Sequence, residues 1–392
     1  MKALVIAPQP FYSPRGTPFS VYYRTLISSE LGVEIDFLTY GEGEDVDISN
    51  VRIIRIPRFK SLGNVKIGPS ALKLFLDVFI VLKMIGLLIR NKYDFVHAHE
   101  ESVFFARFLK PFFKFKLIYD MHSSLPQQLT NFNFSKSKLL FNILKKLEHS
   151  CLHAADGIIT ICPDLYNHVN SIIHDKRKHF LIENSIFEPV KLKNNNSTKN
   201  SVDDSIDYNN LKDLELVVYA GTLEKYQGID LLIKGFKITL EEVPNAFLIV
   251  VGGTPDQVRE YSNLARELNI NSKIKFTGRV SQSLAKKYSA MAKVLVSPRS
   301  DGTNTPLKVY EQLASGIPLV ATKIYSHTQV LTDDIAYLVE PTPEAIGKGI
   351  AQALNNKSES AKKVEAAKRI YEEKYSRAVY TQKLKQLLEI IS

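Results

Sequence analysis

The residues whose types and spacing best fit chemistry lie in segment 297–322. An apolar run ends at Val296, a polar loop containing Gly302 follows, and Pro306 stands where a helix would begin. Proline favours that position because the first helical N–H needs no partner. The loop and the unpaired N–H groups at a helix start can bind a phosphate group. This segment therefore predicts a site for a phosphorylated ligand.

Two charged residues follow on the expected helix. Lys308 lies in its first turn, where a cation opposes the helix dipole unless an anion binds there too. Glu311 comes three residues later and projects from the same side of the helix. A carboxylate beside a phosphate site can accept two hydrogen bonds from a ribose diol. An ordinary surface Lys–Glu pair is the alternative interpretation.

Two other loops place polar groups directly after expected strands. His122 follows an apolar run at 117–119, and its imidazole can donate a hydrogen bond to a ligand hydroxyl or help to carry developing charge. A structural loop histidine is the alternative. Gly16, next to Arg15, follows the first apolar run and permits close backbone approach to an anion at a helix start. A plain tight turn is the alternative there.

Metal centres and disulfides are not expected. His97 and His99 are two positions apart on an expected strand with no third ligand in the pattern, which is weak evidence for a metal site. Cys151 and Cys162 are the two cysteines, and they form no CxxC pair, so a reducing compartment fits best.

These loops lie between short apolar runs that read as buried strands. The expected strands are 3–7, 33–38, 51–56, 95–97, 117–119 and 157–161, then 216–220, 247–251, 274–276, 294–296, 319–321 and 336–339. Helical patterns lie between them at 19–29, 71–90, 139–154 and 164–173, then 230–241, 256–268, 281–291, 306–314, 343–355 and 361–374. This alternation predicts an α/β chain with parallel sheets covered by helices on both faces.

The length of 392 residues suits two domains, and segment 191–212 is polar and rich in Lys, Asn and Ser. We expect two doubly wound, Rossmann-like domains at 1–190 and 213–374, a linker at 191–212, and a C-terminal helix at 375–392 that packs back toward the first domain. Ligands of such sheets bind at the carboxyl ends of the strands, where the polar loops lie. The two domains should therefore face each other across a cleft.

The sequence resembles the family 4 glycosyltransferases. Residues 311–322 match the second half of the family's paired-glutamate motif, with Thr303 in the place of the first glutamate, and residues 218–236, 247–253 and 276–280 match other family segments. The resemblance covers nearly the whole chain. It implies the GT-B fold and hexosyl-type transfer, with retention of configuration, from a nucleotide diphosphate sugar to a saccharide or lipid-linked acceptor. It implies no cofactor and no metal.

The resemblance also implies roles for single residues. Glu311 would hold the ribose hydroxyls, and His122 would contact the donor sugar near the reacting carbon; with Lys308 these are the expected catalytic residues. Many members clamp the diphosphate with an Arg and a Lys where this chain has Thr222 and Gln227, so Lys308 and backbone amides would do more of that work. The remaining residues expected at the donor site are Gly16, Gly221, Thr222, Arg279, Arg299, Thr303, Asn304, Thr305, Pro306 and Leu307.

The positive charge of the chain is concentrated in one stretch. Residues 51–150 hold 17 Lys and Arg against 6 Asp and Glu, out of a net charge of +10. Phenylalanines alternate with lysines in segment 103–116, so we expect region 65–146 to contact an anionic membrane. For helix 72–89 alone we expect core packing with a solvated charged arc formed by Lys73, Asp77, Lys83 and Arg90. Its longest apolar run is six residues, too short for a membrane span.

We therefore expect a cytoplasmic glycosyltransferase of cell-surface polysaccharide or glycolipid synthesis, peripheral at the inner face of the cell membrane. An epimerase or hydrolase acting on nucleotide sugars with the same scaffold is one alternative. A non-catalytic protein that binds membrane or nucleic acid through the basic stretch is the other, and no nucleic-acid motif supports a nucleic-acid partner. Because the first glutamate of the motif is missing, an inactive transferase is a further alternative.

Overall fold

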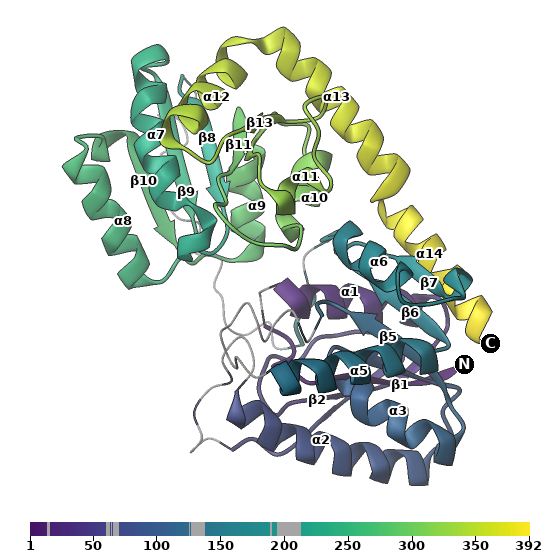
Figure 1. The fold of residues 1–392 in the computed structure, drawn as a ribbon. Helices are drawn as coiled ribbons and strands as arrows, with labels where there is room; N and C mark the ends of the chain where they lie inside the picture. Colours follow the sequence, from purple (N-terminus) through teal and green to yellow (C-terminus); the bar gives the residue numbers. More distant parts are fainter. Residues whose placement is uncertain are drawn as a thin grey trace. The chain divides into compact units, whose positions relative to one another are not determined.

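The structure is a computed structural model of the 392-residue chain, and it describes residues 1–13, 16–59, 63, 65, 70–124, 126, 138–188, 190–193 and 213–392. The chain divides into two compact units (Figure 1): unit 1 is Met1–Ser197 with Arg377–Ser392, and unit 2 is Thr198–Ser376. Most of the expected linker, Arg15 beside Gly16, and residues 127–137 of the basic region lie outside the described residues.

Unit 1 is built on a seven-stranded parallel sheet of order β3-β2-β1-β4-β5-β6-β7. The strands are β1 (Lys2–Ala7), β2 (Glu34–Thr39), β3 (Val51–Arg55), β4 (Phe95–His99), β5 (Lys116–Met121), β6 (Gly157–Thr160) and β7 (His179–Leu181). The central strands are buried along nearly their whole length, as continuous apolar runs predict for a sheet covered on both sides. Their carboxyl ends share one edge, which is where His99 and Asp120 lie.

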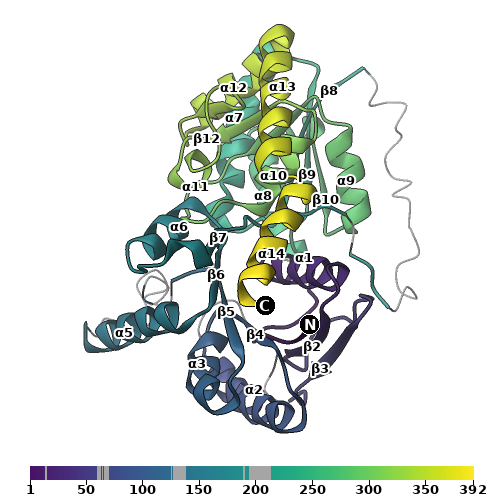
Figure 2. The ribbon, with the colours of Figure 1, turned by 90° about the vertical axis from the view of Figure 1, so that its right-hand side faces the viewer.

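Helices cover both faces of this sheet. They are α1 (Gly16–Glu30), α2 (Ala71–Arg90), α3 (Ser102–Phe113), α5 (Lys138–Ala154), α6 (Pro163–Asn170), η2 (Lys176–Lys178) and α14 (Arg377–Ile391). Apolar residues of α2, α3, α5 and α6 share one core with the sheet. The C-terminal helix α14 contacts α1 and β6 instead (Figure 2).

The orientation of α2 agrees only in part with the expected solvated charged arc, because Lys83 and Arg90 are exposed whereas Lys73 and Asp77 are partly buried. Asp77 is partly buried, and its Oδ1 accepts a hydrogen bond of 2.6 Å from the Tyr40 hydroxyl. Burial raises the pKa of Asp77 to about 7. The exposed face also carries the large apolar side chains Leu74, Phe75, Val78, Leu82 and Ile89. Asp77 thus has a partner inside the fold, while Lys83, Arg90 and these apolar side chains face outward.

Unit 2 is a second parallel sheet, of order β10-β9-β8-β11-β12-β13. Its strands are β8 (Glu215–Ala220), β9 (Ala246–Val251), β10 (Ile274–Gly278), β11 (Val294–Ser297), β12 (Leu319–Thr322) and β13 (Tyr337–Val339). Its helices are η4 (Lys225–Gln227), α7 (Ile229–Glu242), α8 (Pro255–Glu267), η5 (Asn271–Lys273), α9 (Gln282–Ala290), α10 (Leu307–Ala314), α11 (Tyr325–Thr328), α12 (Pro343–Asn355) and α13 (Lys357–Lys374).

The helices of unit 2 also form two layers. Apolar residues of α7, α8 and α12 pack on one face of the sheet, and those of α9, α10 and α13 pack on the other. The predicted pair of Rossmann-like α/β sheets is thus confirmed. Among the helices that the structure describes, none combines the length and the hydrophobicity needed to span a membrane.

Candidate functional site

The candidate donor site of unit 2 is made by two loops that follow β8 and β11. The Ser300 N–H donates a 2.9 Å hydrogen bond to the Tyr226 carbonyl, which ties the loops together. Gly228 lies between them with φ 67°, and a Cβ there would overlap the Pro298 carbonyl oxygen, so only glycine fits this contact. Both loops leave the carboxyl edge of the sheet, where doubly wound sheets bind ligands.

Lys308 is the most unusual group of this site. Its ammonium lies 4.0 Å from the centroid of the Tyr219 ring and donates a weak 3.5 Å hydrogen bond to Gln227 Oε1. Within the described part of the chain it forms no ion pair with an acidic side chain. Burial, and then the nearby Arg299, lower the pKa of Lys308 to about 7. An ammonium in this position is short of negative charge, which an anionic ligand would supply.

Arg299 organises the loop after β11. Its Nε donates to the Asp301 carbonyl at 2.6 Å and its Nη1 donates to the Asn304 carbonyl at 3.2 Å. The guanidinium also stacks 5.1 Å from the centroid of the Tyr226 ring. A Cβ on Gly302, where φ is 128°, would overlap the guanidinium. Arg299 thus braces the loop that leads to α10, and its predicted contact with phosphate stays a prediction.

The start of α10 presents backbone amides and a buried hydroxyl on the helix that carries Lys308. The helix begins at Leu307, with Pro306 as the N-terminal cap and no side-chain hydrogen bond to the first amides. The Thr305 hydroxyl is buried without a hydrogen-bond partner. Thr303 is exposed, and its carbonyl accepts a hydrogen bond of 2.5 Å from Gln329 Nε2. Amides at a helix start that no side chain caps, together with a hydroxyl that lacks a hydrogen-bond partner, can bind an anion.

Glu311 faces a different neighbour from Lys308. Its carboxylate lies 3.5 Å from Lys286 Nζ of α9, and both side chains are about one-third exposed. Burial raises the pKa of Glu311, and Lys286 partly offsets that rise. The ribose role predicted for Glu311 therefore has to compete with an existing ion pair.

The other predicted donor residues lie on the same edge of unit 2. Gly221 and Thr222 are exposed directly after β8, and a Cβ on Gly221 would come within 2.8 Å of the Tyr219 hydroxyl and 3.5 Å of Lys308 Nζ. The Tyr219 hydroxyl donates to the Thr222 carbonyl at 2.6 Å. Arg279 is exposed directly after β10, and its predicted contact with phosphate stays a prediction.

Two predicted residues belong to unit 1. Gly16 is exposed at the start of α1, and a Cβ there would meet no atom within 4 Å, so the described fold does not itself require glycine. His122 follows β5 and is 3 % exposed. Burial is the main reason why its pKa falls to about 4, so the ring is neutral near pH 7. His122 lies among buried polar residues that the sequence analysis treated separately.

These neighbours form a buried cluster around Asp120. The carboxylate contacts Arg24 Nε at 3.0 Å, His97 Nε2 at 3.1 Å and His99 Nδ1 at 3.4 Å. His122 Nε2 lies 3.3 Å from Asp120 Oδ1 and 3.3 Å from His99 Nδ1. The sequence predicted a role for His122 but none for Arg24. An arginine within the mainly uncharged helical pattern of 19–29 was the feature that could have indicated a buried ion pair.

The cluster also bears on metal binding. His97, His99 and Asp120 present ligand atoms within 4.8 Å of one another, a spacing that a divalent cation could bridge. However, Arg24 already contacts Asp120 Oδ2, the oxygen nearest both histidines. A metal would add two positive charges beside a buried guanidinium, which is unfavourable. The geometry therefore favours a hydrogen-bonded ion pair, and the expected absence of a metal stays a prediction.

Each half of the chain matches a known protein family. A family described as "Glycosyltransferase Family 4" matches residues 26–186, and one described as "Glycosyl transferases group 1" matches residues 203–371. The chain is a family 4 glycosyltransferase. It is an enzyme with the GT-B fold, as the sequence resemblance predicted.

This glycosyltransferase is 22% identical over 346 residues to an uncharacterized glycosyltransferase of Methanocaldococcus jannaschii, an alignment that spans 85% of this chain and 86% of that protein. Its fold is similar to that of sucrose-phosphate synthase from Thermosynechococcus elongatus, with a TM-score of 0.72, 18% identity and coverage of 99% and 98% of the two chains. HepE from Anabaena, solved with UDP and glucose, gives a TM-score of 0.71 at 13% identity, with 99% of both chains covered.

Proposed function

We propose that this glycosyltransferase moves a hexosyl group from a nucleoside diphosphate sugar to a saccharide or lipid-linked acceptor, with retention of anomeric configuration. The observation that carries the donor assignment is Lys308, a partly buried ammonium that meets a tyrosine ring and an amide oxygen but no carboxylate of the residues that the structure describes. Amides that the N-terminal cap residue does not bind through a side chain, and the Thr305 hydroxyl, which lacks a described hydrogen-bond partner, lie at the start of the same helix. This is a set of groups that suits a diphosphate.

The proposed mechanism depends on electrostatics and positioning. Lys308 and the amides at the start of α10 would stabilise the negative charge that develops on the departing diphosphate. Retention would follow from attack on the same face that the leaving group departs from, with the leaving phosphate helping to deprotonate the acceptor hydroxyl. No nucleophile and acid pair of carboxylates was identifiable in the sequence, which favours this route over a glycosyl-enzyme intermediate.

The donor assignment is tested by binding and turnover. UDP is the first probe because the similar fold of HepE was solved with it. We expect UDP and UDP-glucose to raise the melting temperature of the wild-type protein, and Lys308→Met to abolish that rise. Lys348→Met, which removes an exposed lysine of α12 in the same unit, is the matched control and should leave it intact. If no nucleoside diphosphate in a panel of bases stabilises the protein, the donor assignment is wrong.

Turnover separates transferase from the alternatives on the same scaffold. A transferase releases nucleoside diphosphate faster when an acceptor is present, whereas a hydrolase releases it equally without one. An epimerase releases none and changes the sugar instead. We expect acceptor-dependent release, and the other two results would replace the proposed activity.

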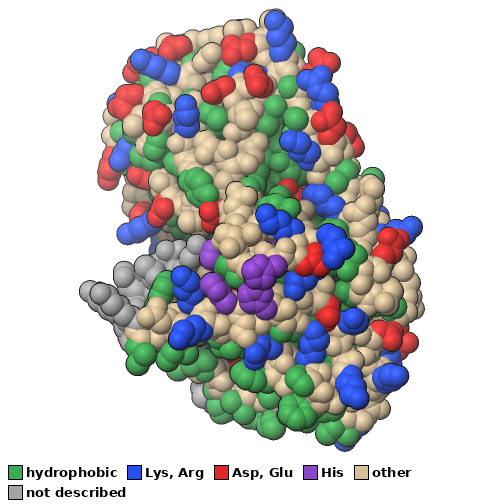
Figure 3. All heavy atoms as spheres, turned by 45° about the vertical axis from the view of Figure 1, so that its right-hand side comes forward, with side chains coloured by type: hydrophobic (Ala, Val, Ile, Leu, Met, Phe, Trp, Pro, Cys, Tyr) green, Lys and Arg blue, Asp and Glu red, His purple; other side chains and the backbone are tan. Residues whose placement is uncertain are grey.

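A membrane-bound acceptor is supported by the outer surface of unit 1. Leu74, Leu82 and Ile89 of α2 are 67%, 62% and 70% exposed, and Phe112 of α3 is 79% exposed. Figure 3 shows hydrophobic side chains gathered along the lower border of unit 1, with lysine and arginine side chains among them. Soluble proteins seldom expose so many large apolar side chains together unless they bind a partner or a membrane.

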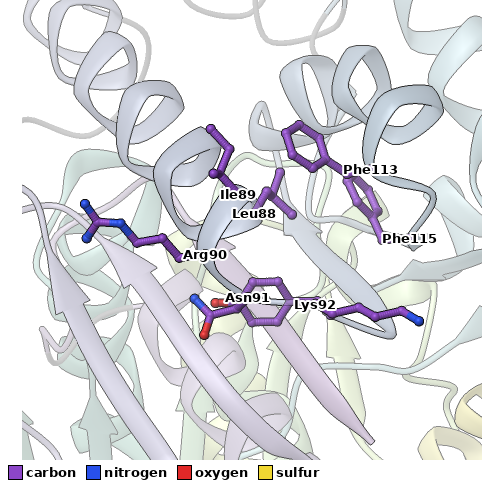
Figure 4. Close-up of a pocket in the computed structure, with 8 residues that line it drawn as sticks. Leu88, Ile89, Arg90, Asn91, Lys92, Phe113 and Phe115 are labelled. Atoms are coloured by element: carbon purple, nitrogen blue, oxygen red, sulfur yellow. The ribbon is translucent and has the colours of Figure 1, made fainter.

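Basic groups accompany this apolar surface. Exposed lysines and arginines on or beside α2, α3 and α5 are Lys83, Arg90, Lys114, Lys116, Lys145 and Lys146. A cavity of about 230 Å³ opens where α2 and α3 end, and Figure 4 shows Leu88 and Ile89 near Phe113 and Phe115, with Arg90 and Lys92 directed away from one another. Apolar side chains bordered by cations suit an anionic bilayer. We therefore place the enzyme at the inner face of the cell membrane, in polysaccharide or glycolipid synthesis.

Vesicle flotation tests the membrane assignment. We expect the protein to float with vesicles of phosphatidylcholine and phosphatidylglycerol at low salt, and to float less with phosphatidylcholine alone. Leu82→Asp should reduce flotation, whereas Tyr325→Asp, at a similarly exposed residue of unit 2, should not. Equal flotation of both variants, or none by the wild type, would exclude this surface.

A further inference from the structure

A buried histidine of unit 2 lies beside the start of the loop that follows β11. His327 of α11 is fully buried, as are Ser297, the last residue of β11, and Thr322, the last residue of β12. β11 and β12 are neighbours in the sheet, so these residues share its carboxyl edge. The donor loop, residues 298–306, begins at this point and ends where α10 starts. His327 therefore lies where the donor loop leaves the sheet.

Both ring nitrogens of His327 have hydrogen-bond partners. Nδ1 lies 2.8 Å from the Thr322 carbonyl oxygen, and Nε2 lies 3.0 Å from the Ser297 hydroxyl. Burial is the main reason why the pKa of His327 falls to about 4, so the ring is neutral near pH 7. Because a carbonyl only accepts hydrogen bonds, Nδ1 carries the single proton, and Nε2 accepts from the Ser297 hydroxyl. The ring thus links the ends of β11 and β12.

Neighbours of His327 hold the donor loop at two further points. The Thr322 hydroxyl donates a hydrogen bond to the Arg299 carbonyl oxygen, and Gln329, which follows α11, donates from Nε2 to the Thr303 carbonyl oxygen. Such contacts reduce the conformational freedom of a loop, which a ligand would otherwise have to restrict when it binds. Segment 322–329 therefore supports the donor loop from its start to its middle.

The charges that act on His327 belong to the donor site. Among the residues that the structure describes, Lys308 and Arg299 are the charged groups that lower the pKa of the ring further. A charged imidazole would repel both cations. A neutral ring supports the loop without adding to the positive charge that is already there. His327 therefore lies near both cations expected to meet the donor.

We propose that His327 is a positioning residue for the donor loop, which it holds in place through Ser297 and the end of β12. Held in this way, the loop keeps Arg299 and Lys308 together at the donor site. The ring is fully buried, so it acts through the loop and not by touching the donor. The order of the loop is a property of the free protein, whereas its effect on donor binding rests on the proposed function.

Hydrogen exchange of the full chain without ligand tests the positioning. The Ser300 N–H donates to the Tyr226 carbonyl when the donor loop is in place, so its exchange reports the order of the loop. We expect exchange in peptides that cover the loop to be about tenfold faster in His327→Leu, which removes both ring hydrogen bonds. Ser297→Ala, which removes one hydroxyl, should give a smaller increase, and it is the second variant if His327→Leu does not fold.

His179 of unit 1 provides the matched control. It is also buried, its Nε2 lies 2.9 Å from the Thr160 hydroxyl, its Nδ1 lies 2.9 Å from Asn170 Oδ1, and burial lowers its pKa to about 4. His179→Leu should leave the exchange of the donor loop unchanged. If it speeds that exchange as much as His327→Leu does, or if no folded variant at His327 or Ser297 speeds it, the positioning proposal is overturned.

A double-mutant cycle tests whether His327 acts through Ser297. In the wild type, Ser297→Ala leaves the buried Nε2 without its donor, whereas His327→Leu has no Nε2 to leave unpaired. We therefore expect the double variant to exchange its donor loop as fast as His327→Leu alone. Effects that add in full would mean that the two side chains act separately, which contradicts the proposed support.

Binding of UDP then measures the consequence for the donor. The Kd for UDP should rise by about 10- to 100-fold in His327→Leu, the range seen when a residue that orients a binding group is lost, and stay unchanged in His179→Leu. The KM for UDP-glucose should rise likewise, and kcat should fall less, because bound donor itself orders the loop.

The outcomes separate this proposal from the proposed function. If the loop of His327→Leu exchanges faster but the Kd for UDP is unchanged, the support has no consequence for the donor, and that part of the proposal is refuted. If the wild type binds no nucleoside diphosphate, the proposed function fails, while hydrogen exchange still decides whether His327 positions the loop.

Discussion

Arg24 of unit 1 is fully buried and Lys308 of unit 2 is partly buried, and these two cations near the carboxyl edges of the sheets have different surroundings. Arg24 in unit 1 is fully buried, with the Asp120 carboxylate 3.0 Å away. Lys308 in unit 2 faces the Tyr219 ring and the Gln227 amide, and no acidic side chain among the residues described pairs with it. One cation is neutralised by the fold, and the other is not.

This difference separates a cation that stabilises the fold from a cation that can bind a ligand. A buried cation with its own carboxylate adds no net charge, and removing either partner leaves the other unpaired at a high cost. A cation that lacks a counter-charge is kept in the folded state at a cost to stability, and an anionic ligand can recover that cost on binding. We therefore assign Arg24 to the support of a site and Lys308 to a ligand. The predictions below test that division.

The largest expected effect is on turnover by Lys308→Met. Loss of one preorganised donor to a developing anion typically lowers turnover by about 10² to 10³-fold. Because Lys308 leaves no unpaired carboxylate behind, the melting temperature without ligand should stay the same or rise. UDP-glucose turnover and thermal unfolding of the same preparation measure both effects. A variant that loses stability together with activity would show that Lys308 is structural.

Arg24→Met should show the opposite pattern, with a loss of stability first. Removing one member of a buried pair costs about 3 to 5 kcal/mol, because Asp120 would remain buried and charged. Chemical denaturation measures this loss in the free energy of unfolding. Adding Asp120→Asn to Arg24→Met should recover part of it. If Arg24→Met is as stable as the wild type, the pair does not support the fold and the comparison fails.

The sheets were predictable because their strands are continuous apolar runs. Each of the twelve expected strands overlaps a strand of the structure, and the missed strand is β7, a three-residue strand at His179–Leu181. Helix α3 was left unassigned because its phenylalanines alternate with basic residues and Pro111 lies inside it. Periodicity identifies an element well when its pattern has one clear apolar face.

The site was less predictable, because tertiary contacts decide it. Helix α2 was expected with the right bounds, but Asp77 was expected in solvent, whereas it accepts a hydrogen bond from Tyr40, the residue that directly follows β2. Likewise, Arg24 and Asp120 are about one hundred residues apart in the sequence, and only the sheet order brings them together. The donor loop lies between the end of a strand and the start of a helix and contains a glycine, so its residues could be predicted from the local sequence.

Glu311→Ala tests a charged group that is intermediate between Arg24 and Lys308. Glu311 has an oppositely charged partner, as Arg24 does, but its side chain remains about one-third exposed. If it holds the ribose hydroxyls, its loss removes hydrogen bonds to a charged group, each worth about 1.5 to 3 kcal/mol. We expect donor KM to rise by about 10- to 100-fold and most transfer activity to be lost. Lys286→Ala is the control. Equal damage by both variants would mean that the Lys286–Glu311 pair is structural.

The smallest expected effect is a pH dependence of UDP binding. Burial lowers the pKa of Lys308 to about 7, so the free protein loses this positive charge as the pH rises above 7. UDP is already fully ionised there, since the second phosphate pKa is about 6. The Kd for UDP, measured by calorimetry between about pH 7 and 9, should therefore rise by up to about tenfold per unit. In Lys308→Arg, whose guanidinium stays charged, it should stay flat.

Over the same pH range, the free energy of unfolding of the free protein should rise while its affinity for UDP falls. The lysine of the unfolded chain keeps its proton up to about pH 10.4, whereas folded Lys308 releases it near 7. The unfolded state then binds more protons, so stability rises with pH between these values. Arg24, paired with Asp120, should give no such change in this range. A Kd for UDP that falls as the pH rises would contradict the assignment of Lys308 to an anionic ligand.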